Sequence, residues 1–516
     1  MRAVVGRAAL IILAATATGR ALGLVRDMVT SRYFGATSAT DAYFLAYKIP
    51  YLLVLMAGGA LTAVFVPILT YRISTGRRQE AWDLSVNLGN LIFLALLGLT
   101  GLLVIIAPWI IPLVGFGFSQ STADKAVFLF RLLMIGVVFD SMSGLVAGML
   151  NSLKRFALVA FAPALGTLVT VVVLIALAQP LKITSLAIGS VLGSVTGFLL
   201  LLPGLRDQGI RYRPRIYWKD PAIREVGGMV WPVLLGSAVG KISIFSDQVM
   251  ASLLVVGSVS SLSYADKLFQ LPLGLFVAGI TVPIFPLLSE RVAANAPEQV
   301  KATINFALRL MGFLMIPATV GIIVLRNPIV AAIYQGGEFK SADTLRTGWV
   351  LLFESLGLYS YAGRDTLTRV FYAYHDTRTP VKISAAAVFL NIGVSYLFMR
   401  LIGVAGLTLG TSVALTVNFV VLIELLRRKI GPMGFREILK SLLRVTGAAV
   451  GMGVIIWPLD YLLAHRLHAG SPTFLIRTVV GIGSGAGVFF LLSWLFRVPE
   501  AAEIVGMLGA VFRRKR

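Results

Sequence analysis

The stretch Gly19-Arg20-Ala21-Leu22-Gly23-Leu24-Val25-Arg26-Asp27 places two arginines and an aspartate directly after an apolar run that begins at Ala8. A charge near the centre of a bilayer costs at least about 2.5–3.5 kcal/mol on insertion scales. Charged residues inside spanning helices therefore face a partner charge or a water-filled cavity. The quoted stretch indicates a membrane-embedded transport pathway.

The composition is that of an all-α polytopic membrane protein. The 516 residues are 57% hydrophobic and 13% charged, whereas soluble domains carry about 25% charged residues. There is no cysteine, and there are only three histidines, so we expect no thiolate or histidine centre and no enzymatic activity. Basic loops beside anionic membrane lipids explain the net charge of +23, and no nucleic-acid partner is expected.

Fourteen segments are long and apolar enough to cross a bilayer, which takes roughly 20 residues. Basic residues gather in alternate loops, so the positive-inside rule places both termini in the cytoplasm. The segments lie near 8–30, 41–70, 84–112, 126–151, 157–179, 183–203, 226–253, 262–289, 304–325, 346–373, 381–400, 404–427, 438–462 and 473–497.

A weak internal sequence repeat divides the first twelve segments into two lobes of six. The longest basic connection, about 204–225, separates them. Lys48-Ile49-Pro50 in the second segment is matched by Gln270-Leu271-Pro272 in the eighth. Repeats with proline-broken helices at matching positions are typical of secondary transporters. We predict an N-lobe over 1–215, a C-lobe over 216–430, and an extra helix pair with a basic tail over 431–516.

The two arginines of the opening stretch are predicted to form an anion clamp. A guanidinium binds a phosphate group with two parallel hydrogen bonds. Arg20 and Asp27 are seven residues apart and share one helix face, so the alternative is an internal salt bridge, with the other arginine reaching the membrane interface. The clamp is favoured because Arg20 and Arg26 outnumber Asp27 and leave one cation in excess.

Asp41 and Lys48 repeat the seven-residue spacing in the second segment, beside three tyrosines at helical intervals. They either line the cavity or form a local ion pair in an interfacial aromatic belt. Lys267 and Gln270 take up the matching position early in the eighth segment, and one shared cavity explains both sets of charges. The candidate substrate-binding residues are Arg20, Arg26, Asp27, Asp41, Lys48, Lys267 and Gln270.

These motifs resemble the MurJ/MviN family, the lipid II flippases of bacterial peptidoglycan synthesis, which belong to the multidrug/oligosaccharidyl-lipid/polysaccharide exporter superfamily. The resemblance covers nearly the whole chain. Its most specific part is the arginine stretch. It is carried by residues 20–27, 34–36, 39–44, 65–69, 151–156, 264–267, 335–339 and 379–382.

The resemblance implies a V-shaped, two-lobed fold around a cationic central cavity, with two additional C-terminal helices. It implies a monomer in the bacterial inner membrane that flips undecaprenyl-pyrophosphate-linked precursor, lipid II, to the outer leaflet by alternating access. The family's essential cations match Arg20, Arg26 and Lys267, and an important acid matches Asp41. The family's usual arginine is Lys267 here, and a neighbouring acid is Gln270.

A sodium site is also implied by the resemblance, because some family members bind this ion in the C-terminal lobe. The matching residues are Asp247, Asn391 and Thr411, with a backbone carbonyl near Leu407. Ser395 stands where a second acid is usual. Sodium, a proton and a structural pair with Lys241 all remain open for Asp247, and no other cofactor is expected.

Two other transport functions remain as alternatives. The central charge pattern does not separate lipid II from another lipid-linked glycan as the substrate. A multidrug-type antiporter for small cations is disfavoured, since its cavity should be acidic and the bias here is basic. A membrane-embedded enzyme lacks any histidine or paired-carboxylate centre.

Overall fold

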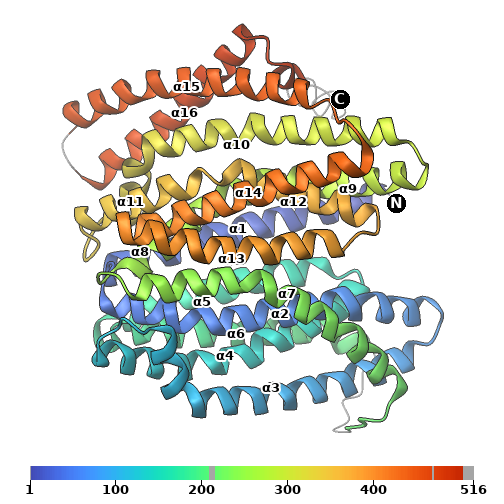
Figure 1. The fold of residues 1–516 in the computed structure, drawn as a ribbon. Helices are drawn as coiled ribbons and strands as arrows, with labels where there is room; N and C mark the ends of the chain where they lie inside the picture. Colours follow the sequence, from blue (N-terminus) through green and yellow to red (C-terminus); the bar gives the residue numbers. More distant parts are fainter. Residues whose placement is uncertain (1, 209–215, 468–469, 504–516) are drawn as a thin grey trace. The chain divides into compact units, whose positions relative to one another are not determined.

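The computed structural model describes residues 2–208, 216–467 and 470–503, and the regular elements in these ranges are all helical (Figure 1). The all-α class expected from the sequence is confirmed. The elements are α1 (Arg2–Phe34), α2 (Ser38–Ser74), α3 (Arg78–Val114), α4 (Gln120–Ser152), α5 (Phe156–Leu181), α6 (Thr184–Leu201), the 3-10 turn η1 (Leu202–Gln208), α7 (Pro221–Ser252), α8 (Ser258–Pro272), the π-helical turn η2 (Leu273–Val277), α9 (Ala278–Ala293), α10 (Pro297–Tyr334), α11 (Ser341–Ser355), α12 (Leu358–Ala373), α13 (Arg378–Ile402), α14 (Val404–Ile430), α15 (Phe435–Arg466) and α16 (Ser471–Leu495).

Two predicted spans are each built from more than one helix. The segment predicted at 262–289 is divided by η2, which begins directly after Pro272. Proline has no N–H to donate and interrupts the helical ladder, and π turns occur at such interruptions. The segment predicted at 346–373 is divided between α11 and α12 at Gly357. Each remaining segment coincides with one helix.

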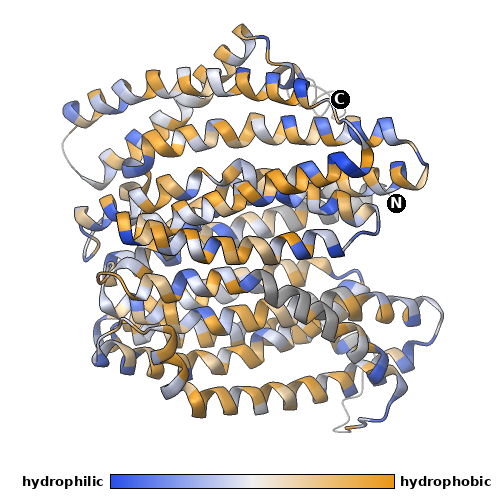
Figure 2. Ribbon diagram, viewed as in Figure 1, coloured by the Kyte–Doolittle hydropathy of each residue, from blue (hydrophilic) through white to orange (hydrophobic). Residues whose placement is uncertain are grey.

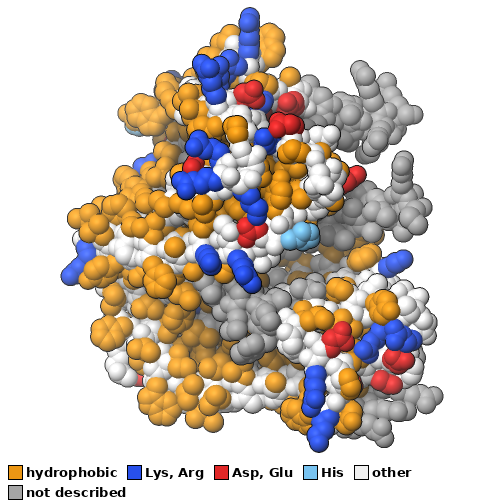
Figure 3. Space-filling view, turned by 45° about the vertical axis from the view of Figure 1, so that its right-hand side comes forward, with side chains coloured by type: hydrophobic (Ala, Val, Ile, Leu, Met, Phe, Trp, Pro, Cys, Tyr) orange, Lys and Arg blue, Asp and Glu red, His pale blue; other side chains and the backbone are white. Residues whose placement is uncertain are grey.

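Ten helices in the described ranges are long and apolar enough to cross a membrane: α2 to α6, α10, and α13 to α16. The chain is therefore a multi-span membrane protein, while the number fourteen stays a prediction. Apolar residues run along most of these helices, and hydrophilic residues gather toward helix ends (Figure 2). The space-filling view likewise shows broad hydrophobic areas with separate groups of lysine and arginine (Figure 3).

The chain forms two compact units. The first comprises Met1–Ser260 with Gly337–Phe339, and the second comprises Ser261–Gly336 with Lys340–Arg516. Helix α7 thus belongs to the first unit in this structure, although the sequence assigns it to the C-lobe. The predicted domain boundaries at 215 and 430 concern the functional lobes and stay a prediction.

The first unit packs its helices closely through small residues. A Cβ atom at Gly166 of α5 would lie 2.6 Å from the carbonyl oxygen of Gly193 on α6, and one at Gly193 would lie 2.5 Å from the oxygen of Gly166. Only glycine permits this approach of two helix backbones, which is a common packing mode in membranes. The close pair fixes α6, which presents Ser190 and Ser194 to the site described below.

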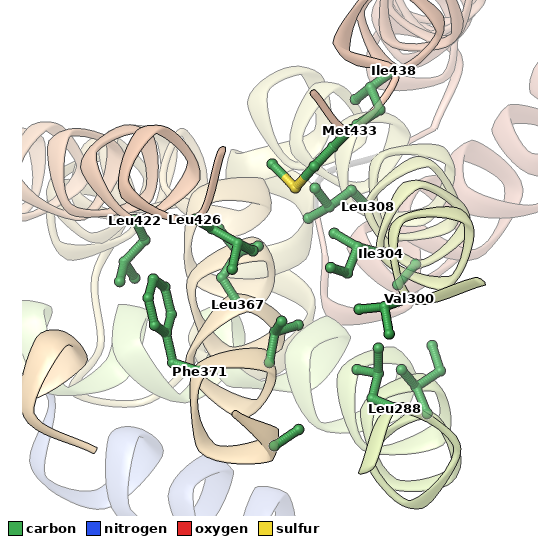
Figure 4. Close-up of a cluster of buried hydrophobic side chains, with 14 of the residues drawn as sticks. Leu288, Val300, Ile304, Leu308, Leu367, Phe371, Leu422, Leu426, Met433 and Ile438 are labelled. Atoms are coloured by element: carbon green, nitrogen blue, oxygen red, sulfur yellow. The ribbon is translucent and has the colours of Figure 1, made fainter. Parts of the chain in front are cut away.

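The second unit has a buried cluster contributed by five helices (Figure 4). Its members come from α9, α10, α12, α14 and α15, and Leu288 of α9 and Phe371 of α12 are each 1% exposed. The members labelled in Figure 4 are Leu288, Val300, Ile304, Leu308, Leu367, Phe371, Leu422, Leu426, Met433 and Ile438.

An ion pair outside the spans ties the turn between α12 and α13 to the end of α14. The Lys429 ammonium donates to Asp376 Oδ2 over 2.9 Å, and Thr379 N donates to Asp376 Oδ1 over 3.0 Å. The hydrogen bond from Lys429 is the main reason that the pKa of Asp376 falls to about 2. Because the pKa is depressed, the pair stabilises the fold above the ordinary carboxyl pKa, and that stabilisation is lost only as pH falls through about 2.

Glu500 fixes the segment after α16 to two other helices. Its side chain is fully buried, and Oε1 accepts hydrogen bonds from Arg309 Nε of α10 and from Ser441 Oγ of α15. Figure 1 shows α10 alongside α15 and α16. A buried charge whose partner is removed is strongly destabilising, so this contact holds the C-terminal helix pair in place.

We expect Glu500→Gln to lower the free energy of unfolding by about 3 kcal/mol, because Arg309 loses the carboxylate with which it forms an ion pair at a site that is largely buried. Thermal unfolding of the purified protein measures this loss. The control is Glu424→Gln, which removes an exposed partner of Arg427 and Arg428 and should cost less than about 1 kcal/mol. Equal melting temperatures for the two variants would contradict the role of Glu500.

Candidate functional site

Arg26 and Asp27 form an ion pair inside the apolar part of α1. Arg26 Nε and Nη2 lie 3.1 and 3.0 Å from Asp27 Oδ1, and the two side chains are 26% and 8% exposed. The pairing is between chain neighbours, because the long arginine side chain folds back along the helix. The sequence left an internal salt bridge open as the alternative to a clamp, and the arginine that pairs with Asp27 is Arg26. Arg26 Nη1 has no hydrogen-bond partner in the described part of the chain, so this nitrogen can donate to a ligand.

Arg20 lies on the same helix and is exposed. It makes no hydrogen bond or ion pair with any described residue. Asp27 is neutralised by Arg26, so the three charged side chains together carry one excess positive charge. Such an excess in an apolar helix requires water or an anion.

A stack of tyrosines lies beside this charge. The ring centroids of Tyr43 and Tyr47 are 5.8 Å apart, and those of Tyr47 and Tyr51 are also 5.8 Å apart. The hydroxyls of Tyr43 and Tyr47 interact electrostatically with Arg26, and the Tyr43 hydroxyl is 3.0 Å from Ser190 Oγ of α6. The i, i+4 spacing in α2 therefore gives a wall of phenol groups next to the arginine.

Asp140 is a charged residue that our sequence analysis did not select. It lies in α4, where Ser194 Oγ of α6 donates to its Oδ2 over 2.9 Å, and it interacts electrostatically with Tyr47. No lysine or arginine among the described residues pairs with it. The signal was present, because a lone acid in the middle of the span predicted at 126–151 has the same cost as the charges in the first span.

Asp41 is held by a turn that is distant in sequence. Its Oδ2 accepts from Gly257 N over 2.6 Å, and its Oδ1 accepts from Ser260 N over 2.7 Å and from Ser260 Oγ over 2.6 Å. Asp41 is 3% exposed. Gly257 adopts φ +89°, which favours glycine and directs its N–H to the carboxylate.

The pair of Asp41 with Lys48 that the spacing suggested is not formed. Lys48 is half-buried and has no hydrogen bond or ion pair with any described residue. Three donors from the turn at 257–260 already occupy the Asp41 carboxylate. Direct contact of either residue with substrate stays a prediction.

Lys267 and Gln270 belong to the second unit and are described there. Lys267 Nζ lies 5.7 Å from the ring centroid of the buried Tyr264, which is within the range of a cation–π contact. Gln270 is exposed and donates to Asp266 Oδ2 over 2.9 Å, so it serves to hold an acid close to Lys267. The assembly of Lys267 with the arginines of α1 into one cavity stays a prediction.

Three of the four residues expected to hold sodium gather in the second unit. Ser395 Oγ donates to Asn391 Oδ1 over 2.9 Å and lies 3.2 Å from the Leu407 carbonyl oxygen, which also accepts from Thr411 Oγ1 over 3.1 Å. Asn391 and Leu407 are buried. Oxygen ligands of this kind suit hard cations. Asp247 belongs to the first unit.

The family model and the related proteins that match this chain carry the same family name. The family model described as "Lipid II flippase MurJ" matches residues 30–481. A Vibrio cholerae protein named "Probable lipid II flippase MurJ" is 31% identical over 500 residues, with 94% of this chain and 95% of that protein covered. A Burkholderia cenocepacia "Lipid II flippase MurJ" is 30% identical, with 82% and 84% covered.

Solved structures agree. One described as "Lipid II flippase MurJ, inward closed conformation" matches with a TM-score of 0.79 and 26% identity, covering 94% of this chain and 98% of that one. An inward-facing multidrug resistance transporter of the MATE family matches with a TM-score of 0.72, covering 82% and 98%. Its identity is 15%, so it shows a shared fold alone.

We expect Asp41→Asn to destabilise the turn at 257–260, because an amide nitrogen replaces one acceptor oxygen and the charge is lost. Hydrogen bonds to charged groups contribute about 1.5–3 kcal/mol each, so a loss of about 2 kcal/mol is expected. Hydrogen–deuterium exchange should accelerate at Gly257 and Ser260, while Asp83→Asn on an exposed face of α3 leaves it unchanged. Unaltered exchange in Asp41→Asn would show that the turn does not depend on this carboxylate.

Proposed function

The chain belongs to the lipid II flippase MurJ family, and we propose that it flips lipid II from the inner to the outer leaflet of the bacterial cytoplasmic membrane. It is a transporter and not an enzyme. Alternating access, in which the site opens to one side of the membrane at a time, suits the fold that it shares with MATE transporters.

The observation that carries the proposal is the excess positive charge in α1. Lipid II has a pyrophosphate and a polar sugar–peptide that must pass about 30 Å of hydrocarbon. Arg20 has no partner among the described residues, and Arg26 Nη1 remains available beside Asp27. These guanidinium groups can replace the water around the phosphates, because arginine binds phosphate oxygens through two hydrogen bonds at once.

Asp27 and the tyrosine stack complete the mechanism. In the absence of substrate, Asp27 compensates Arg26 and lowers the cost of its burial. An arriving pyrophosphate brings more negative charge than one carboxylate, so it competes for the guanidinium. The Tyr47 hydroxyl, which interacts with Arg26, offers a neutral donor for a sugar or phosphate oxygen.

The same excess charge disfavours the multidrug alternative. A site with one net positive charge repels cationic drugs, and the MATE resemblance concerns the fold alone. A different lipid-linked glycan would satisfy the phosphate chemistry equally. The family relationship selects lipid II.

We also propose that both termini face the cytoplasm, that the transporter is a monomer, and that anionic lipids surround it. Basic loops on alternate connections support the orientation. Broad apolar areas with grouped cations support contact with anionic lipid (Figure 3).

Coupling to sodium is a further proposal, supported by the oxygen atoms of Asn391, Leu407 and Thr411 in the second unit. It predicts that sodium, but not potassium, raises the melting temperature of the purified protein. The effect should disappear in Asp247→Asn and in Asn391→Ala. Stabilisation that persists in both variants would place the ion elsewhere, and no sodium effect at saturating salt would argue against binding.

We expect Arg26→Ala and Arg20→Ala to abolish growth of a strain depleted of its own lipid II flippase, because the pyrophosphate loses a charged partner. Both variants should accumulate in the membrane at the wild-type level. Arg32→Ala, which removes an exposed arginine from the same helix, is the matched control and should support growth. Lys267→Arg should also support growth and Lys267→Gln should not. Normal growth with either clamp variant would refute the clamp.

A further inference from the structure

A charged pocket lies in the second unit. Its volume is about 290 Å³, and it is lined by the C-terminal half of α10, the end of α15 and the first half of α16. We call it the Arg326 pocket and define it by Arg326, Asn327, Trp457, Asp460 and Arg477.

One of the two arginines in the pocket is neutralised. Arg477 Nε and Nη2 donate to the two oxygens of Asp460, each over 2.8 Å, and both side chains are largely buried. This bidentate pair has no remaining charge to offer. It also joins α15 to α16 and so makes a rigid wall.

Arg326 is the uncompensated charge. It has no carboxylate partner among the described residues, and its Nη1 donates only to the Ile323 carbonyl oxygen over 2.6 Å. Its Nε is buried without any hydrogen-bond partner. The guanidinium carbon lies 4.9 Å from the ring centroid of Trp349, within the range of a cation–π contact. A buried N–H without a partner costs about 1–3 kcal/mol.

Asn327 adds a second unsatisfied group to the same pocket. Its Oδ1 is buried without a hydrogen-bond partner. The oxygen and nitrogen of an asparagine amide exchange places when the group turns by 180°, so the side chain can present its NH₂ to an acceptor. Two adjacent residues with unused hydrogen-bonding capacity beside a net positive charge describe a site for an anion.

The position of the pocket relative to the membrane indicates where its anionic ligand comes from. The pocket is near the end of α10 opposite to the basic loops, which is the outer side in the orientation proposed above. Trp457 lines it and is 66% exposed, and Tyr461 follows one turn later at 57%. Tryptophan and tyrosine concentrate at the membrane–water interface, where lipid phosphates are found.

We propose that the Arg326 pocket binds the phosphate group of a lipid headgroup in the outer leaflet. A phosphodiester carries one negative charge, equal to the excess charge of the pocket, and its free oxygens can bind the Arg326 guanidinium and the Asn327 side chain that line the pocket. The ligand is either an anionic phospholipid or a polyprenyl-linked phosphate. The inference depends on the proposed orientation, but binding can be measured without transport.

The experiment measures lipid binding to the purified full-length protein in detergent by native mass spectrometry. The probes are dioleoylphosphatidylglycerol, undecaprenyl phosphate and soluble glycerol 3-phosphate, with dioleoylphosphatidylcholine as the zwitterionic reference. Arg326→Gln should weaken binding of at least one anionic lipid about tenfold, the value of one charge-assisted hydrogen bond. Arg326→Lys should retain part of the affinity, which separates loss of charge from loss of folding.

The matched control is Arg400→Gln. Arg400 is exposed at the end of α13 and also lies over an aromatic ring, that of Tyr396 at 5.8 Å, but it lines no part of the pocket. Unchanged binding in this variant supports the site. A preference for phosphatidylglycerol identifies a phospholipid, and a preference for undecaprenyl phosphate identifies a polyprenyl-linked phosphate.

Equal lipid affinity in Arg326→Gln and in the wild type would overturn the proposal. Binding of glycerol phosphate alone, or no preference for the anionic lipids over phosphatidylcholine, would also overturn it. None of these three results would affect the proposed flippase function, which is tested by growth with the α1 variants.

Discussion

The structure depends on one constraint, that a charge within hydrocarbon needs a partner or water. Most charged groups buried in the helices meet it locally. Arg477 pairs with Asp460, Arg309 pairs with Glu500, and Asp41 accepts three hydrogen bonds from one turn. The contacts of Glu500 and Asp41 join segments that are distant in sequence, so groups that are costly to bury also fix the packing of each unit.

The exceptions to this constraint indicate function. Arg20 and Arg326 have no compensating acid among the described residues. Arg26 pairs with Asp27 through two of its nitrogens and keeps Nη1 available. Replacing such a cation with an apolar residue would save free energy if stability were the only requirement. Cations that are retained without a partner are therefore best explained by an anionic ligand, and all three are arginines, whose geometry suits phosphate.

The sequence was sufficient for the fold class, the positions of the apolar segments and the family, because segment length and charge placement are local properties. It did not predict the turn that holds Asp41, since the donors at Gly257 and Ser260 are more than 200 residues away. The sequence also did not predict the contact of Asp140 with Ser194 or that of Arg326 with Trp349, because each joins two different helices. Seven-residue spacing showed which residues share a helix face, but side-chain length and donors on other helices decided the actual partners.

The bonds of Asp41 also bear on how access can change. They connect the start of α2 to the turn between α7 and α8 within the first unit. Any motion that separates these elements must break three hydrogen bonds to one carboxylate, at about 1.5–3 kcal/mol each. That cost is of the size that binding of a pyrophosphate to Arg20 and Arg26 can offset. An empty transporter would therefore keep α2 and the turn at 257–260 together.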